Sequence, residues 1–175
     1  MKARSEGVEG MEKIAKFERV SADRFYEDMH ASVEQIETYE GIKLPRRATV
    51  HSAGYDFYAP YDVFLPAGGA VIVPTGIRVR IDEGWVLKIY PRSGLGFKLG
   101  LRLMNTVGII DGDYYYSSNE GHIMIKVFNP SQSSVTLSAG SAFAQGVFVP
   151  YGITEDDDVT AVRDGGFGST DKKQV

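Results

Sequence analysis

Apolar and polar residues alternate over several short stretches of the chain. Over residues 77–81 isoleucine and valine alternate with arginine, the period-two pattern of a strand with one buried face. Residues 70–73 are apolar throughout and predict a strand buried on both faces. Further strands are expected at 85–90, 123–128 and 143–149. Glycine and proline return about every ten residues from Val50 onward, so the pattern predicts an all-β barrel or sandwich.

The two ends of the chain differ from this pattern. An apolar stretch at 14–20 precedes Ser21, which is expected to cap a helix with Phe25, Met29, Val33 and Ile36 on one face. The C-terminal end is polar and glycine-rich, and it cannot form a core alone. The sequence therefore predicts three parts: an N-terminal elaboration packed on the barrel at 1–45, a β-barrel core at 46–152, and a flexible arm at 153–175.

Composition narrows the possible functions. Among 175 residues, 19 Lys and Arg against 23 Asp and Glu give a net charge of −4, so no broad basic surface is expected for a nucleic acid polymer. The absence of cysteine excludes disulfides and thiol nucleophiles. No apolar run suits a membrane span or a signal peptide, which predicts a cytoplasmic protein without membrane contact. The three histidines are scattered, and the acidic run at 155–158 reads as a solvated linker.

The segment 105–114 is the strongest candidate for chemistry. Apolar residues lead directly to Asp111, in a turn that contains Gly112 and Asp113. A carboxylate at the end of a buried strand is suited to take a proton from water. Asp and Gly are also favoured in turns for backbone reasons alone, and in isolation the turn interpretation is the stronger of the two.

Three other segments suit a phosphorylated ligand. Residues 91–94 are expected to open a helical turn whose N–H groups, with Arg92 and Ser93, meet a phosphate; the alternative is a plain Ser-Gly turn. Asp56 interrupts a strand-like run and needs a cation or a structural hydrogen bond if it is buried. The tail at 163–170 offers glycine N–H groups, two hydroxyls and Arg163 to an anion, and its alternative is a disordered tail. Phe167 favours the ligand interpretation, because a lone aromatic there suits stacking on a flat base.

Taken together and in order, these segments resemble the five signature motifs of the trimeric dUTP pyrophosphatases, the dUTPases. The resemblance runs from about residue 51 to 170, with motifs at 53–59, 91–95, 108–114, 140–145 and 163–170. It implies an all-β, jelly-roll-like β-barrel and a homotrimer with three active sites, each assembled from all three chains. It also implies Mg²⁺-assisted hydrolysis of dUTP to dUMP and pyrophosphate, which limits uracil in DNA and supplies dUMP.

The resemblance assigns roles to individual residues. Asp111 would activate the water that attacks the α-phosphorus, and Asp56 would order water on the Mg²⁺ that the triphosphate brings. Tyr114 would pack under the deoxyribose, where a 2′-hydroxyl would not fit. The uracil edge would be read by Asn105 and by the hairpin backbone near 121–124, which includes Met124. Gly108 would also belong to the substrate-binding residues.

The phosphates would be held from two directions. A neighbouring subunit would supply the phosphate contacts Arg92, Ser93, Gly94 and Gln145. Arg163 would grip the terminal phosphate and Phe167 would stack on uracil. The arm would then close as a lid with Gly168, Ser169 and Thr170.

The sequence departs from the family pattern at several places. Residues 115–119 lengthen the hairpin after Tyr114, Ala142 stands where an arginine is common, and Asp171 replaces a frequent glycine. The N-terminal 45 residues have no counterpart in the basic pattern. Two alternatives stay open: a related dCTP deaminase, although those enzymes use a catalytic Glu that 105–113 lacks, and a nucleotide-sensing protein that binds a partner through the N-terminal helix or the longer hairpin.

Overall fold

The computed structural model describes residues 11–29, 39–161 and 163, and it is built mainly from short strands. Among the described residues, the strands are interrupted by the helices α1 (Ala22–Met29) and α3 (Ser93–Leu99) and the 3-10 helix η2 (Gly112–Tyr116). The strands are β1 (Ala15–Arg19), β2 (Arg46–Arg47), β3 (Tyr55–Tyr58), β4 (Val63–Leu65), β5 (Ala70–Pro74), β6 (Ile77–Ile81), β7 (Trp85–Pro91), β8 (Arg102–Leu103), β9 (Gly108–Ile110), β10 (Met124–Phe128), β11 (Val135–Leu137) and β12 (Ala142–Pro150). The all-β prediction is confirmed, and each strand expected from the patterning is present.

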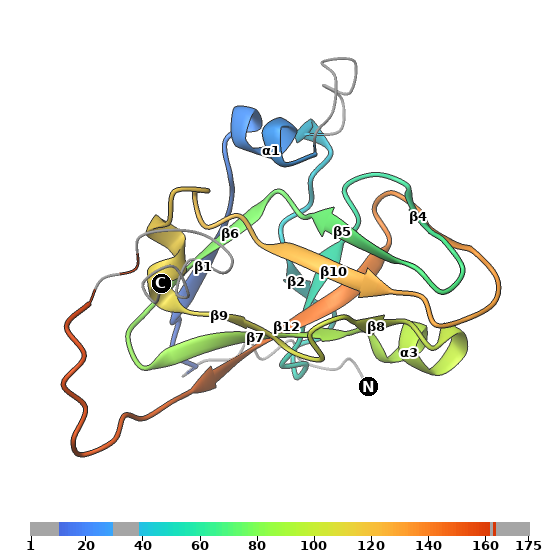
Figure 1. The fold of residues 1–175 in the computed structure, drawn as a ribbon. Helices are drawn as coiled ribbons and strands as arrows, with labels where there is room; N and C mark the ends of the chain where they lie inside the picture. Colours follow the sequence, from blue (N-terminus) through green and yellow to red (C-terminus); the bar gives the residue numbers. More distant parts are fainter. Residues whose placement is uncertain (1–10, 30–38, 162, 164–175) are drawn as a thin grey trace, which may run out of the picture.

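The strands that the structure describes pair in antiparallel fashion. The largest sheet has the order β2-β3-β12-β7-β9, and a second has the order β5-β10-β8. Strand β1 pairs with β6, and β11 pairs with β4. Figure 1 shows β10 and β5 lying above β12 and β7, with α1 at the top of the molecule. This arrangement leaves the space between the two layers for the core.

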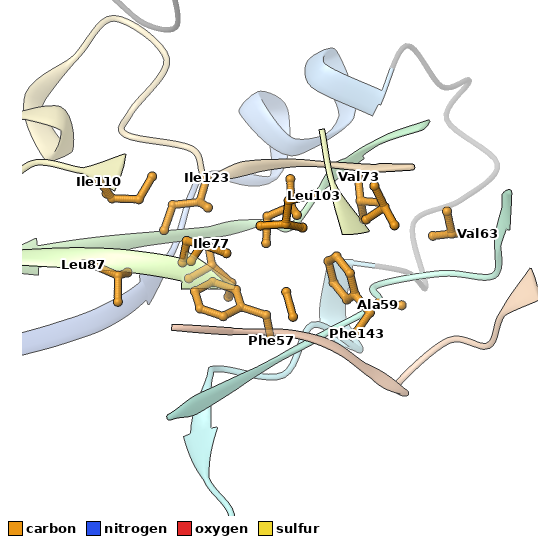
Figure 2. Close-up of a cluster of buried hydrophobic side chains, with 14 of the residues drawn as sticks. Phe57, Ala59, Val63, Val73, Ile77, Leu87, Leu103, Ile110, Ile123 and Phe143 are labelled. Carbon is orange, nitrogen blue, oxygen red and sulfur yellow. The ribbon is translucent and has the colours of Figure 1, made fainter. Parts of the chain in front are cut away.

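Apolar side chains from both layers form one buried cluster. Phe57 and Leu87 on the large sheet meet Val73 and Ile125 on the second, and all four are at most 3% exposed. Figure 2 shows these layers meeting around Ile77, Ile123 and Phe143. Burial of this many apolar side chains is the main term that stabilises such a domain.

The N-terminal segment packs on the strands. Strand β1 pairs with β6 along its whole length, and Phe25 of α1 is fully buried in the common core. The Ser21 hydroxyl accepts a hydrogen bond from the Arg24 backbone N–H (3.1 Å), which confirms the predicted helix cap. The predicted continuation of the apolar face at Val33 and Ile36 lies outside the described residues.

One prediction about burial is wrong. Strand β5 is not buried on both faces, because Ile72 is 50% exposed while Val73 is fully buried. Ile72 lies opposite Lys126 of β10, on the side of the sheet that faces away from the core. An unbroken apolar run gives no periodicity from which the buried face can be read.

No helix in the described ranges is long and apolar enough to cross a membrane.

Candidate active site

Asp111 lies at the junction of β9 and η2. Strand β9 delivers Ile110 into the core, and the next residue starts the 3-10 helix with extended backbone angles (φ −77°, ψ 157°). This geometry leaves the Asp111 side chain 49% exposed. The carboxylate is therefore at the surface, at the end of a strand whose other residues fix its position.

The C-terminal segment returns to this carboxylate. In Figure 1 the chain after β12 leaves the sheets and comes back to η2. There the guanidinium of Arg163 donates to Asp111 Oδ2 (2.7 Å) and to Asp113 Oδ1 (2.9 Å). Its Cζ also lies 5.7 Å from the centre of the Tyr114 ring. The structure thus brings together the third and fifth motifs of the sequence within a single chain.

A pocket lies beside this junction. Its walls come from β7, β9 and β10, and it includes Asn105, Gly108 and Met124, three of the residues predicted to bind substrate. Gly108 packs closely on β7, because a Cβ there would lie 3.1 Å from Ile89 Cβ and would require Ile89 to shift. The pocket is half apolar and half polar, which suits a flat base with hydrogen-bonding edges.

A second cluster joins the first, second and fourth motifs. Arg92 Nε lies 3.0 Å from Asp56 Oδ1, and Asp56 is opposite Gln145 in the β3–β12 pair. The Gln145 amide donates to the Pro91 carbonyl (3.2 Å). Arg92 is the residue before α3, as the predicted helical turn requires, and Ser93 and Gly94 in its first turn are exposed.

The two clusters lie apart in one chain. Ile110, just before Asp111, is opposite Leu87 near the start of β7, whereas Arg92 follows the end of β7. Five residues of strand separate these points, or roughly 17 Å. No hydrogen bond or ion pair among the described residues joins them. Within a single chain, Arg92 is therefore too far from Asp111 for both to contact the same phosphorus.

Tyr114 is more deeply buried than its neighbours in η2. It is 4% exposed, and its hydroxyl donates to the His122 carbonyl (2.7 Å) and accepts from the Asn119 amide (2.8 Å). Burial raises the pKa of the Tyr114 phenol. The tyrosine does not line the pocket, and it contacts the site through Arg163. The longer hairpin at 115–119 therefore fixes the position of Tyr114 through the hydrogen bond from Asn119 to its hydroxyl.

Within 11–29, 39–161 and 163, no three His, Cys, Asp or Glu residues are grouped to hold an ion.

The predicted lid residues Phe167, Gly168, Ser169 and Thr170 and the altered position Asp171 lie outside the described residues.

One pocket residue was missed by the sequence analysis. Lys126 lines the pocket two residues after Met124, on the same face of β10. The sequence contained the signal for Lys126, because side chains two residues apart in a strand share a face and Met124 was already predicted to lie at the site. Leu103 also lines it, but its apolar character gave no sign of a role beyond the core.

Comparison with known proteins agrees with these motifs. A sequence model of the dUTPase family matches residues 40–171. The deoxyuridine 5′-triphosphate nucleotidohydrolase of Lactococcus lactis is 41% identical over 133 residues, which cover 74% of this chain and 89% of that protein. The same enzyme from Escherichia coli O9:H4 is 41% identical over 138 residues, covering 74% of this chain and 88% of that protein.

Solved structures show the same fold. The dUTPase from Streptococcus mutans matches with a TM-score of 0.64 at 36% identity, covering 79% of this chain and 98% of that one. The dUTPase from phage phi11 of S. aureus matches with a TM-score of 0.63 at 20% identity, covering 85% and 97% of the two chains. These similarities confirm the jelly-roll-like fold class.

Proposed function

The chain belongs to the dUTPase family, and from that premise we propose how its residues carry out the reaction. It is a dUTP diphosphatase that hydrolyses dUTP to dUMP and pyrophosphate. This reaction limits uracil in DNA and supplies dUMP. The observation that carries the residue assignment is the carboxylate of Asp111, held by Arg163 beside the pocket.

Asp111 is the general base in this proposal. Its carboxylate accepts the proton of the water that attacks the α-phosphorus, and pyrophosphate leaves on the opposite side. The site shows the necessary exposure, since the side chain is about half exposed and a water can approach it. When dUTP binds, Arg163 exchanges its two carboxylate partners for the terminal phosphate, which places the cation near the developing charge.

The pocket beside Asp111 binds deoxyuridine. Asn105 and the backbone around Met124 supply hydrogen bonds to the uracil edge, with Gly108 leaving room for the ring. Tyr114 packs under the deoxyribose, and Phe167 stacks on the base from the arm. Discrimination against other bases then comes from polar groups that a wrong base leaves unpaired.

The phosphate contacts come from a neighbouring subunit. We propose a homotrimer in which Arg92, Ser93, Gly94 and Gln145 of one chain face Asp111 of another. The separation of roughly 17 Å along β7 within one chain supports this arrangement. The lid residues Gly168, Ser169 and Thr170 close over the triphosphate. We place this enzyme in the cytoplasm, with residues 46–152 as its catalytic core and 153–175 as its arm.

Asp56 fits a magnesium ion that arrives with the substrate. A single carboxylate, 14% exposed, suits Mg²⁺, which is usually held by one or two carboxylates, several waters and substrate phosphates. When bound, Mg²⁺ offsets part of the roughly four negative charges of the triphosphate. The Arg92 ion pair keeps the Asp56 carboxylate compensated before substrate binds.

Replacement of Asp111 tests the base assignment. Asp111→Asn keeps the shape of the side chain but cannot take the proton, so we expect turnover to fall by roughly 10³-fold or more while dUTP binding stays within a few-fold. Pyrophosphate release measures turnover, and calorimetry with a non-hydrolysable dUTP analogue measures binding. Asp23→Asn, at an exposed position in the first turn of α1, is the control. Turnover near the wild-type rate in Asp111→Asn would refute the role.

A further inference from the structure

The two parts of the chain that depart from the basic family pattern contact each other. The Tyr115 hydroxyl donates to Glu18 (2.6 Å), and the Ser21 hydroxyl donates to Glu120 (2.6 Å). A third bond joins His122 Nδ1 to Asp28 Oδ2 (2.6 Å). The longer hairpin after Tyr114 is thus bound at three points to the segment formed by β1 and α1.

The bond between His122 and Asp28 is the buried one. The imidazole is 0% exposed, and its Nε2 accepts a hydrogen bond from the Gly76 backbone N–H (2.7 Å). Because Nε2 is an acceptor, the proton of a neutral imidazole is on Nδ1 and is donated to Asp28. Asp28 is in turn bound by Arg24 Nε (3.0 Å), so its charge has a partner on the same helix.

The backbone of His122 connects this bond to the substrate site. Its carbonyl accepts the Tyr114 hydroxyl (2.7 Å), and its N–H donates to the Asn119 carbonyl (3.1 Å). The next two residues, Ile123 and Met124, line the pocket. A shift of the imidazole therefore moves both the partner of the Tyr114 hydroxyl and one wall of the pocket.

We propose that Asp28, acting through His122, is a positioning residue for deoxyuridine recognition. Helix α1 then serves the active site: it holds the hairpin so that Tyr114 and the β10 wall of the pocket keep the spacing that accepts a deoxyribose and excludes a 2′-hydroxyl. The inference rests on the proposed contact of Tyr114 with the deoxyribose. It gives the N-terminal segment a role in substrate recognition. A segment that only stabilised the fold would not affect the choice between dUTP and UTP.

Replacement of Asp28 tests this role through specificity. Asp28→Ala leaves the His122 Nδ1–H without its acceptor, and we expect the KM for dUTP to rise about tenfold, kcat to change less than threefold, and the preference for dUTP over UTP to fall about tenfold. Asp28→Asn retains one acceptor oxygen and should restore most of the preference. Asp23→Ala removes an exposed carboxylate from the same helix and is the matched control. All assays are run well below the melting temperature of each variant.

A double variant separates positioning from simple loss of stability. Tyr114→Phe removes one of the two routes by which His122 acts, so adding Asp28→Ala to it should lower the dUTP-over-UTP preference by clearly less than the tenfold effect of Asp28→Ala alone. Additive effects on the preference, or a folded Asp28→Ala enzyme with only a lower melting temperature, would overturn the proposal. Failure of the proposed function has a different signature, because wild-type enzyme would then release no pyrophosphate from dUTP or Asp111→Asn would remain active.

Discussion

Asp111 lies where both of its interpretations from sequence place it, at the turn after a strand. Its side chain makes no capping hydrogen bond to η2, although an Asp in this position commonly does so. The carboxylate is bound by Arg163 from 52 residues further along the chain. Turn chemistry therefore explains the backbone conformation at Asp111. The side chain has no part in the turn, which is consistent with its proposed role as the base.

Gly121 is a residue that the longer hairpin cannot replace. Its φ is +70°, and an added Cβ would lie 2.7 Å from Tyr115 Cα and 2.8 Å from the Tyr114 carbonyl oxygen. We expect Gly121→Ala to lower the free energy of unfolding by about 3 kcal/mol, from left-handed strain plus overpacking. Gly84 has φ +80° and open space around it, so Gly84→Ala should lose only about 1–2 kcal/mol. Urea denaturation measures both, and equal losses would contradict the steric argument.

His122 makes the stability of the protein depend on pH. Burial lowers the pKa of its imidazole from the ordinary value of 6.5, while the hydrogen bond from Nδ1 to Asp28 opposes that shift. As pH falls below 6.5 the unfolded chain takes up a proton that the folded chain does not, so stability decreases until the lower folded pKa is reached.

The comparison with His122→Gln isolates this effect. The variant has no group that titrates at this position, so its melting temperature should fall less between pH 7 and pH 5 than that of the wild type. Each kcal/mol corresponds to about 2–4 °C in a chain of this size. Scanning fluorimetry measures both series, and parallel curves would show that His122 is not the titrating group.

Helix α1 and strand β5 show what patterning can and cannot supply at the scale of elements. The cap at Ser21 and the buried Phe25 follow from local rules, because a capping hydroxyl and a 3.6-residue period are written in consecutive residues. The exposed face of β5 does not follow, because only the pairing with β10 decides which side of an apolar run meets the core. The partner of Asp28 was equally unreadable, since His122 is 94 residues away.

Ser21 ties the start of α1 to the hairpin. Its hydroxyl accepts from the Arg24 N–H and donates to Glu120, and this hydroxyl bond, with a second bond from the Ser21 backbone N–H (2.8 Å), lowers the pKa of the Glu120 carboxyl. Ser21→Ala removes both contacts, and we expect the free energy of unfolding to fall by about 1–2 kcal/mol. Ser134→Ala, at an exposed serine before β11, should change it by less than about 0.5 kcal/mol. A Ser21 variant as stable as the control would mean that the cap contributes nothing.

At the scale of the whole molecule, the order of the motifs was readable from the sequence, but the distance between the two groups of residues within one chain was not. Asn105, Gly108 and Met124 do meet at one pocket, and Asp56, Arg92 and Gln145 meet at another point of the surface. Local sequence places each residue on its strand, yet the separation of the two groups depends on the register of β7 against β9. That register puts Arg92 and Asp111 at opposite ends of β7, and this separation supports the proposal of a site shared between chains.

Mixing two inactive chains tests how the site is shared. One chain carries Asp111→Asn with an intact arm, and the other keeps Asp111 but ends before Arg163. Light scattering should find the full-length variant alone near 58 kDa, three times 19.2 kDa, and the truncated chain as a correspondingly lighter trimer, and each should be nearly inactive. If each site takes Asp111 from one chain and its arm from another, refolding an equal mixture should restore about one quarter of wild-type activity.

The structure sets up a clear contrast for this experiment, because Arg163 contacts Asp111 of its own chain. If that contact is also the arrangement during turnover, no mixed trimer can pair an intact Asp111 with an arm, and the mixture stays inactive. Recovery would instead mean that the contact within one chain belongs to the enzyme without substrate, and that dUTP draws the arm to a neighbouring site. A mixture of wild-type and truncated chains, refolded in the same way, controls for the efficiency of exchange.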